Sequence, residues 1–203
     1  MWPMWQIKNT VHQAHSFFFS SLPVLALLTV GSILGLSQDK PKPETIQAVA
    51  MGTGTQVGKQ THIKLIINEY STEEDRQILI EAFQKGKNQG LVNALEKMRA
   101  VGRIAIEGTL GYDVSYARSI STPTGRKVRF ITNRVLRFGE VYYSNPTIDY
   151  NLTGGEIDLN DQDQSKGTGV LYPAAKLRLD KENQLSLDLN MNPWKLSNIL
   201  TGR

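Results

Sequence analysis

Alternation of apolar and polar side chains in short segments is the feature that most constrains this fold. After Gly102, apolar residues recur at every second position, as at Ile104 and Ile106. This period is that of a strand with one buried face. The same pattern appears in segments 62–70, 112–120, 126–133, 175–179 and 185–189, and further strands are expected at 156–160, 167–172 and 194–199. We therefore expect an antiparallel, meander-like sheet of about seven strands.

Matching the apolar faces of two neighbouring segments predicts the first hairpin. If Ile120 pairs with Val128, Arg118 lies opposite Phe130, and Pro123-Thr124-Gly125 forms a three-residue loop. A two-residue loop would shift the register by one and break the match between the apolar faces.

The later strands follow the same reasoning. Pairing Leu179 with Leu185 predicts a second hairpin around Lys181-Glu182-Asn183. Pro173 is expected to bend or bulge its strand, because proline cannot donate to a sheet ladder. Residues 194–199 are expected to form a last edge strand.

A helical region is predicted between residues 71 and 102. Ser71 and Glu74 have the spacing of a capping box, and GKNQG at 86–90 interrupts the helical pattern. The region predicts a helical hairpin or one kinked helix covering the sheet, which makes the fold class α+β. The apolar stripe before the break consists of Ile78, Leu79, Ala82 and Phe83, and the one after it of Leu91, Ala94, Leu95 and Met98.

The amino-terminal 37 residues contain one charged side chain, Lys8, and the apolar run Phe17–Ser37. One interpretation is a signal peptide cleaved after Ser37, with small residues at Gly35 and Ser37. The other is an uncleaved membrane anchor at 17–37, because about 20 apolar residues can cross a bilayer. Both predict an exported chain, periplasmic or secreted if cleaved and anchored to the cytoplasmic membrane if not.

Residues 38–61 are predicted to form a Pro/Gly-rich linker before a single domain at 62–203. Lys40-Pro41-Lys42-Pro43 favours an extended backbone. The stretch Gly52–Lys59 lacks the first glycine and the hydroxyl residue of a phosphate-binding loop, so we expect a turn and no nucleotide there.

Composition excludes several classes of function. The chain has no cysteine, which excludes disulfides and thiol chemistry, and its three histidines form no triad or metal motif. The net charge of +4 is interleaved along the chain, so no nucleic-acid surface is expected. We predict no catalytic residues, no metal and no cofactor, and membrane contact only through the amino-terminal segment.

Tyr112, Tyr116 and Arg118 are the candidate ligand-binding residues. An arginine among tyrosines on one strand face can hold an anion. The alternative is a structural Arg118, stacked on Phe130 and paired with Asp113, Asp149 or Glu140.

Four segments of the chain resemble a family of uncharacterised exported bacterial proteins. They are Gly102–Thr132, the IDY at 148–150, Gly167–Leu187 and Trp194–Leu196. The resemblance implies export in bacteria and a single domain. It implies no activity and no functional residues.

Two functions from different classes follow as expectations. The first is a non-catalytic binding or interaction domain, whose partner is a protein or a small anionic ligand. The alternative is a hydrolase-like enzyme that uses carboxylate and tyrosine groups, for example Asp113, Tyr116 and Asp149.

Overall fold

The computed structural model describes residues 42–138, 150–179, 185–189 and 191–202. They form nine strands and one long helix, α1. The elements are β1 (Glu44–Gly52), β2 (Gln60–Ile67), α1 (Glu73–Lys97), β3 (Gly102–Ile106), β4 (Tyr112–Thr122), β5 (Gly125–Thr132), β6 (Leu152–Asn160), β7 (Thr168–Leu179), β8 (Leu185–Leu189) and β9 (Trp194–Gly202).

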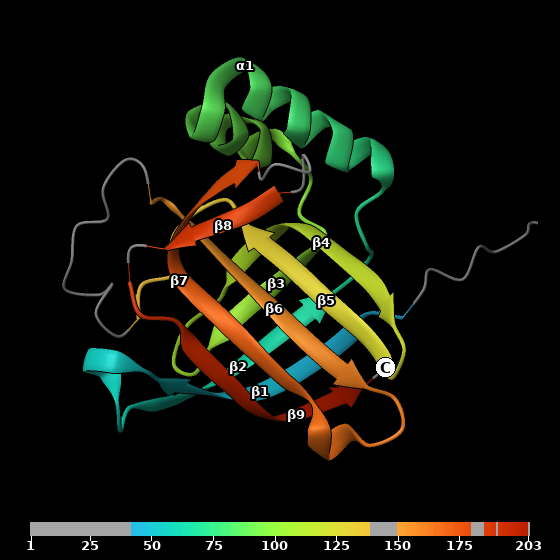
Figure 1. The fold of residues 1–203 in the computed structure, drawn as a ribbon, viewed down its shortest axis with the longest axis vertical. Coiled ribbons are helices and arrows are strands. Elements are labelled where there is room, and N and C mark those ends of the chain that lie inside the picture. The colour runs from blue at the N-terminus through green and yellow to red at the C-terminus, as the bar shows by residue number, and fades with distance from the viewer. Residues whose placement is uncertain (1–41, 139–149, 180–184, 190, 203) are drawn as a thin grey trace, which may run out of the picture. The chain divides into compact units, whose positions relative to one another are not determined.

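Eight of the strands close into an antiparallel barrel (Figure 1). Their order is β6-β5-β4-β3-β2-β1-β9-β7, and a further pairing of β6 with β7 completes the ring. Strand β8 pairs only with the distal half of β7, where Leu179 lies opposite Leu185. This pairing confirms the predicted register of the second hairpin, whose loop lies outside the described residues.

The predicted α+β fold, an open sheet covered by a helical hairpin, is therefore wrong. Closure depends on β1, which pairs with β2 on one side and with β9 on the other. Strand β1 occupies residues 44–52, so this part of the predicted 38–61 linker belongs to the barrel. Strand β9 lies between β1 and β7 and is not an edge strand.

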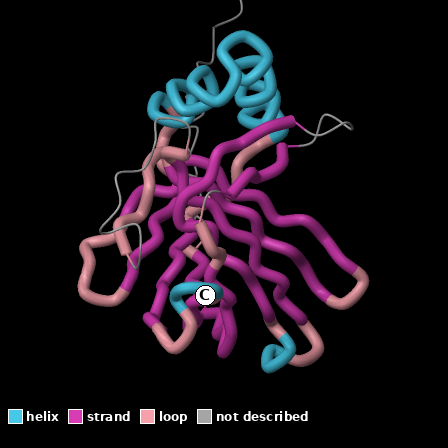
Figure 2. The backbone as a smooth tube through the Cα atoms, turned by 60° about the vertical axis from the view of Figure 1, so that its left-hand side comes forward, coloured by secondary structure: helices cyan, strands magenta, loops and turns pink. Residues whose placement is uncertain are grey.

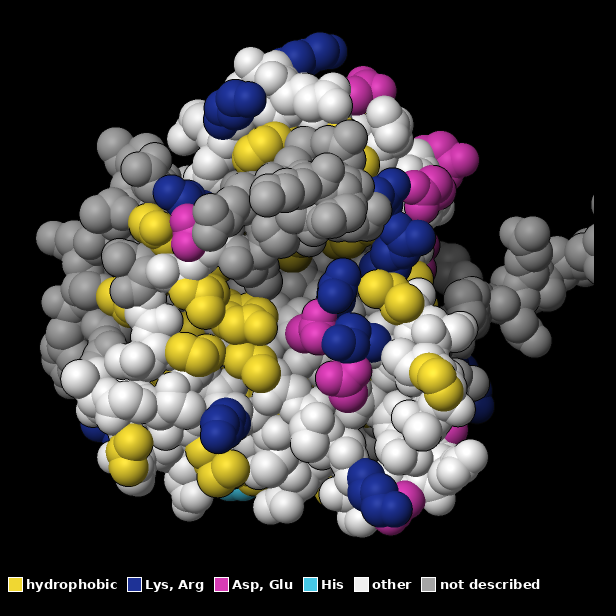
Figure 3. All heavy atoms as spheres, in the orientation of Figure 1, with side chains coloured by type: hydrophobic (Ala, Val, Ile, Leu, Met, Phe, Trp, Pro, Cys, Tyr) yellow, Lys and Arg dark blue, Asp and Glu magenta, His cyan; other side chains and the backbone are white. Residues whose placement is uncertain are grey.

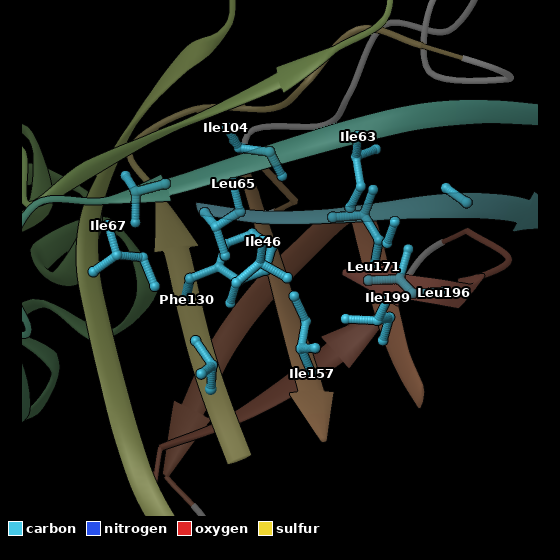
Figure 4. Packing of buried hydrophobic residues seen from close by; sticks show 14 of the residues in the cluster. Ile46, Ile63, Leu65, Ile67, Ile104, Phe130, Ile157, Leu171, Leu196 and Ile199 are labelled. Carbon is cyan, nitrogen blue, oxygen red and sulfur yellow. The ribbon is translucent and has the colours of Figure 1, made fainter. Parts of the chain in front are cut away.

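Apolar side chains fill the inside of the barrel. Figure 4 shows residues from seven different strands pointing toward one another, with Phe130 among the fully buried ones. Gly155 lies opposite Phe130 on β6, and a Cβ atom there would come within 2.5 Å of the phenyl ring. The missing side chain at Gly155 thus makes room for the largest fully buried residue. The labelled residues are Ile46, Ile63, Leu65, Ile67, Ile104, Phe130, Ile157, Leu171, Leu196 and Ile199.

One end of the barrel carries a polar cluster of Glu44, Tyr70 and Arg126. Arg126 donates to both carboxylate oxygens of Glu44, and its Nη1 also lies 2.8 Å from the Tyr70 hydroxyl. The Tyr70 hydroxyl donates to Glu44 over 2.8 Å. The side chain of Glu44 is only 8% exposed, so its charge is compensated by these neighbours and not by water.

Strand β4 contains a β-bulge at Ser115. Val114 lies opposite Thr132 and Tyr116 lies opposite Ile131, so Ser115 is the extra residue. The bulge reverses the alternation of faces along β4. Val114 belongs to the core inside the barrel, whereas Tyr116 packs in a second cluster that also contains residues of α1.

The bulge also corrects the predicted register of the first hairpin. Arg118 lies opposite Arg129 and not Phe130, and Ile120 does not pair with Val128. The turn contains two residues instead of three, because Thr122 pairs with Gly125. The predicted register is wrong because it assumes strict alternation of faces through Ser115.

The predicted irregularity at Pro173 is confirmed. The register between β6 and β7 shifts between the pairs Gly154–Tyr172 and Leu152–Ala175. Two residues of β7 stand there against one of β6, as in a bulge.

Figure 2 shows the barrel strands on one side of the domain and the bent helix α1 beside one end of them.

No helix in the described part of the chain is long and apolar enough to span a membrane. The predicted signal or anchor segment lies outside the described residues.

Candidate functional site

Helix α1 begins one residue later than predicted. Thr72 is the N-cap, and it forms a reciprocal capping box with Asp75. Ser71, the predicted cap, is hydrogen-bonded to β4 instead: its N–H donates to the Ala117 carbonyl, and its hydroxyl accepts from the Ala117 N–H over 3.1 Å. These bonds attach the start of the helix to the barrel wall.

The helix bends sharply at Lys87, where the backbone leaves helical geometry with φ 51°. The bend lies inside the predicted break and divides α1 into two arms. Its two arms meet where Gly90 approaches Ala82: a Cβ at Gly90 would lie 2.3 Å from the Ala82 carbonyl oxygen. Glycine at position 90 is therefore required for the close approach of the arms.

One face of both arms packs on the outside of the barrel. Leu79, Leu91 and Leu95 are fully buried there. They form one cluster with Tyr116 of β4, Ile131 of β5 and Leu152 of β6. The barrel therefore supports the bent helix along its length.

The free faces of the two arms enclose a groove of about 820 Å³, the α1 groove. Its volume falls in the range of small-molecule sites, roughly 300–1,000 Å³. Ile78 lies in it with 51% of its surface exposed. The side chains and glycines that form its apolar part are Tyr70, Ile78, Ala82, Gly86, Gly90, Ala94, Met98 and Val101.

Charged side chains of both signs lie around the α1 groove. Arg99 forms an ion pair with Glu69, and Asp75 is held in the capping box. Lys85 and Lys97 also line the groove, and neither has an ion-pair partner among the residues that the structure describes. The groove therefore combines an apolar floor with unneutralised positive charge.

Tyr70 connects the α1 groove with the polar cluster at the barrel end. Burial, followed by its hydrogen bond to Glu44, raises the pKa of Tyr70 to about 12. The phenol therefore stays neutral at physiological pH and acts as a hydrogen-bond donor, not as a base.

The structure separates Tyr112 from the other two predicted ligand-binding residues, Tyr116 and Arg118. Tyr112 packs against the core inside the barrel, while Tyr116 is buried under α1. Arg118 pairs with Glu73 in the first turn of α1 over 3.2 Å, and Arg76 pairs with the same carboxylate over 2.6 Å. Glu73 is not among the partners predicted for Arg118, of which Glu140 and Asp149 lie outside the described residues.

Burial raises the pKa of Tyr116, although the hydrogen bond with Arg118 opposes this effect. Because Arg118 also pairs with Glu73, the Tyr116–Arg118 pair links β4 to the first turn of α1, and the Arg118 side chain remains 40% exposed.

Two of the three groups named for an enzyme lie among the described residues. Asp113 is exposed on β4, Tyr116 is buried, and Asp149 lies outside the described residues. His62 lies on the barrel wall, where its Nδ1 is 2.8 Å from a carboxylate oxygen of Glu107. The described residues contain no group of three potential metal ligands.

A column of charged side chains is a second conspicuous surface. Figure 3 shows charges of both signs side by side on the face formed by β5 and β6, next to a patch of apolar side chains. Glu156 accepts hydrogen bonds from Lys127 and Arg129, and Lys127 also approaches Asp158 at 3.5 Å. Partial burial disfavours ionised Glu156, but the two cations outweigh it and lower its pKa. These charges compensate one another within the sheet, which favours a structural role.

Several residues of the α1 groove belong to the predicted apolar stripes, but the sequence pattern did not predict a groove. Ile78 and Ala82 belong to the stripe predicted to cover a sheet, but they lie on the groove side while Leu79 packs on the barrel. The sequence signal for the groove was the width of the predicted apolar stripe, together with the small residues Ala82, Gly86, Gly90 and Ala94.

Searches against models of protein families, curated proteins and solved structures found no match to this chain, so the resemblance to exported bacterial proteins stays a prediction.

Proposed function

We propose that this chain is an exported, non-catalytic binding protein whose site is the α1 groove. The ligand is a small amphiphile: its apolar chain lies along Ile78 and Ala82, and an acidic head group faces Lys85 or Lys97. The observation that carries the proposal is the 820 Å³ groove with its apolar floor and its two lysines, neither of which has an ion-pair partner within the described ranges of the chain.

The barrel supports this proposal as a rigid scaffold. Its interior is filled by side chains such as Phe130 and Leu171, both fully buried. At one end the Glu44–Arg126–Tyr70 cluster occupies the space between strands. At the other, Leu136 and Phe138 are buried against the core, and the Phe138 ring meets Trp194 edge to face at 5.0 Å. A ligand therefore has more room outside the barrel than inside it.

The test uses a fluorescent reporter in the groove. Because the chain has no cysteine, Gly86→Cys introduces a single labelling site, and a Cβ at Gly86 meets no atom within 4 Å. The full chain, labelled there with an environment-sensitive dye, is titrated with octanoate, a soluble carboxylate with a short apolar chain. We expect a saturable change in emission.

Ile78→Asp and Leu200→Asp form a matched pair of variants. Both place a carboxylate on an exposed aliphatic position, 51% exposed in the groove and 61% exposed on β9. Ile78→Asp should weaken octanoate binding by about tenfold or more, which corresponds to about 1.4 kcal/mol. Leu200→Asp should leave it unchanged. A wild-type chain without saturation, or two variants that bind alike, contradicts the proposal.

A further inference from the structure

A second cavity, of about 510 Å³, lies on the other side of the second arm of α1. Val92 and Glu96 of that arm form one wall, and Tyr112 at the start of β4 forms another. The segment that follows β5 completes it with Asn133, Val135 and two arginines, and Asn151 adds a further side chain. We call it the arginine cavity after Arg134 and Arg137.

Buried hydrogen bonds fix the segment that carries the two arginines. The Leu136 N–H donates to the Thr153 hydroxyl over 2.8 Å, and that hydroxyl donates to the Pro173 carbonyl over 2.7 Å. The Thr132 hydroxyl donates to the Thr153 carbonyl over 3.1 Å. Both threonines are fully buried, so these bonds are shielded from water.

Alternate residues of the segment are anchored in the barrel. Leu136 is fully buried and Phe138 is 8% exposed, whereas Arg134 and Arg137 are exposed. The backbone is therefore held in place by apolar contacts while the two guanidinium groups remain accessible. A ligand that binds both groups meets a preorganised backbone, which lowers the entropic cost of binding.

The neutral groups of the arginine cavity are also arranged as donors. The amide oxygen of Asn133 accepts from Arg134 Nε over 3.3 Å, and the amide oxygen of Asn151 accepts from Asn88 over 3.4 Å. Each asparagine therefore retains an NH₂ group for another acceptor. The Tyr112 hydroxyl is a further donor.

The charges of the cavity are unequal. Among the described residues that line it, Arg134 and Arg137 stand against one carboxylate, Glu96. An excess of positive charge and several neutral donors suits an anion with more than one oxygen atom, since arginine binds carboxylates and phosphates through two parallel hydrogen bonds.

From this arrangement we infer that the arginine cavity is an anion-binding site for a small phosphate or polycarboxylate. Arg134 and Arg137 supply the charge, and Tyr112, Asn133 and Asn151 supply neutral hydrogen bonds. Of the three ligand-binding residues predicted from the sequence, only Tyr112 belongs to this site. The site is separate from the α1 groove and is independent of the function proposed for it.

Isothermal titration of the full chain with inorganic phosphate and with citrate tests the site and distinguishes the two classes. Sodium chloride at matched ionic strength controls for screening. We expect saturable binding of one of the two anions. Arg134→Gln and Arg137→Gln should each weaken that binding by about tenfold, because each removes a charge-assisted hydrogen bond to the anion. Tyr112→Phe, which keeps the ring in the core, should weaken it several-fold.

Lys195→Gln is the matched control, because it removes one exposed cation from β9, outside the cavity. It should bind the anion as the wild type does. All variants should keep the wild-type unfolding temperature, since both arginines are exposed. If neither phosphate nor citrate binds saturably, the inference is overturned. An equal loss in Lys195→Gln and Arg137→Gln also overturns it, because binding would then follow net charge alone.

Discussion

Replacing Arg126 by methionine removes the cation that compensates Glu44 inside the barrel end. Arg126 is 20% exposed and Glu44 is 8% exposed, so water replaces little of the lost interaction. Breaking a buried ion pair by removing one partner costs about 3–5 kcal/mol. Because Arg126 keeps some solvent contact, we expect Arg126→Met to lower the free energy of unfolding by about 2–4 kcal/mol.

The double variant Glu44→Leu/Arg126→Met separates the charge from the packing. It removes both charges and leaves apolar side chains of similar size, so its stability should lie within about 1 kcal/mol of the wild type. Tyr70 remains in both variants as the common neighbour.

Urea unfolding of the full chain measures both effects. Trp194 is 4% exposed and contacts Phe138, so its emission reports on the barrel. Trp2→Phe and Trp5→Phe make it the sole tryptophan. A loss below about 1 kcal/mol in Arg126→Met, or an equal loss in the double variant, would refute the reasoning that Glu44 depends on its cation.

Three further predictions concern packing, pH and the helix attachment. Gly155→Ala should lower stability by about 1–3 kcal/mol, because its Cβ would press on the Phe130 ring, whereas Gly86→Ala should not; thermal unfolding compares them. Since folding raises the pKa of Tyr70 from 10.0 to about 12, its contribution is complete below pH 10 and is lost as the pH rises toward 12. In Tyr70→Phe, the free energy of unfolding measured in urea should therefore fall less between pH 10 and pH 12 than in the wild type. The difference should be about 1–2 kcal/mol after allowance for the partial exposure of the phenol. Arg118→Met should speed hydrogen exchange in the first turns of α1 without affecting β5; unchanged exchange there would contradict its role in attaching the helix.

Local patterns predicted most of the strands but not their closure into a barrel. The second hairpin and the irregularity at Pro173 follow from alternation and from proline chemistry, which act within a few residues. The pairing of β1 with β9 joins segments at opposite ends of the described chain, and no local signal encodes it. The inner face of β1 carries Ile46 with the small residues Ala48 and Ala50, which made the strand resemble a linker.

Local patterns also failed to predict how the candidate ligand-binding residues are arranged. The sequence places Tyr112, Tyr116 and Arg118 at period two, and the bulge at Ser115 moves the last two to the outer face. An extra residue in one strand depends on the partner strand, so alternation within one segment does not reveal it. Arg134 and Arg137 lie in a segment without periodicity, and only the buried threonine network shows that it is held in a defined conformation.

The central claim is that the barrel is a packed scaffold and that the amphiphilic ligand binds outside it, in the bend of α1. Hydrogen exchange of the full chain with and without saturating octanoate tests this claim most directly. We predict slower exchange in both arms of α1 and in residues 98–101, with unchanged exchange in β1, β2 and β9. Protection of those barrel strands, with α1 unaffected, would place the ligand inside the barrel and contradict the account.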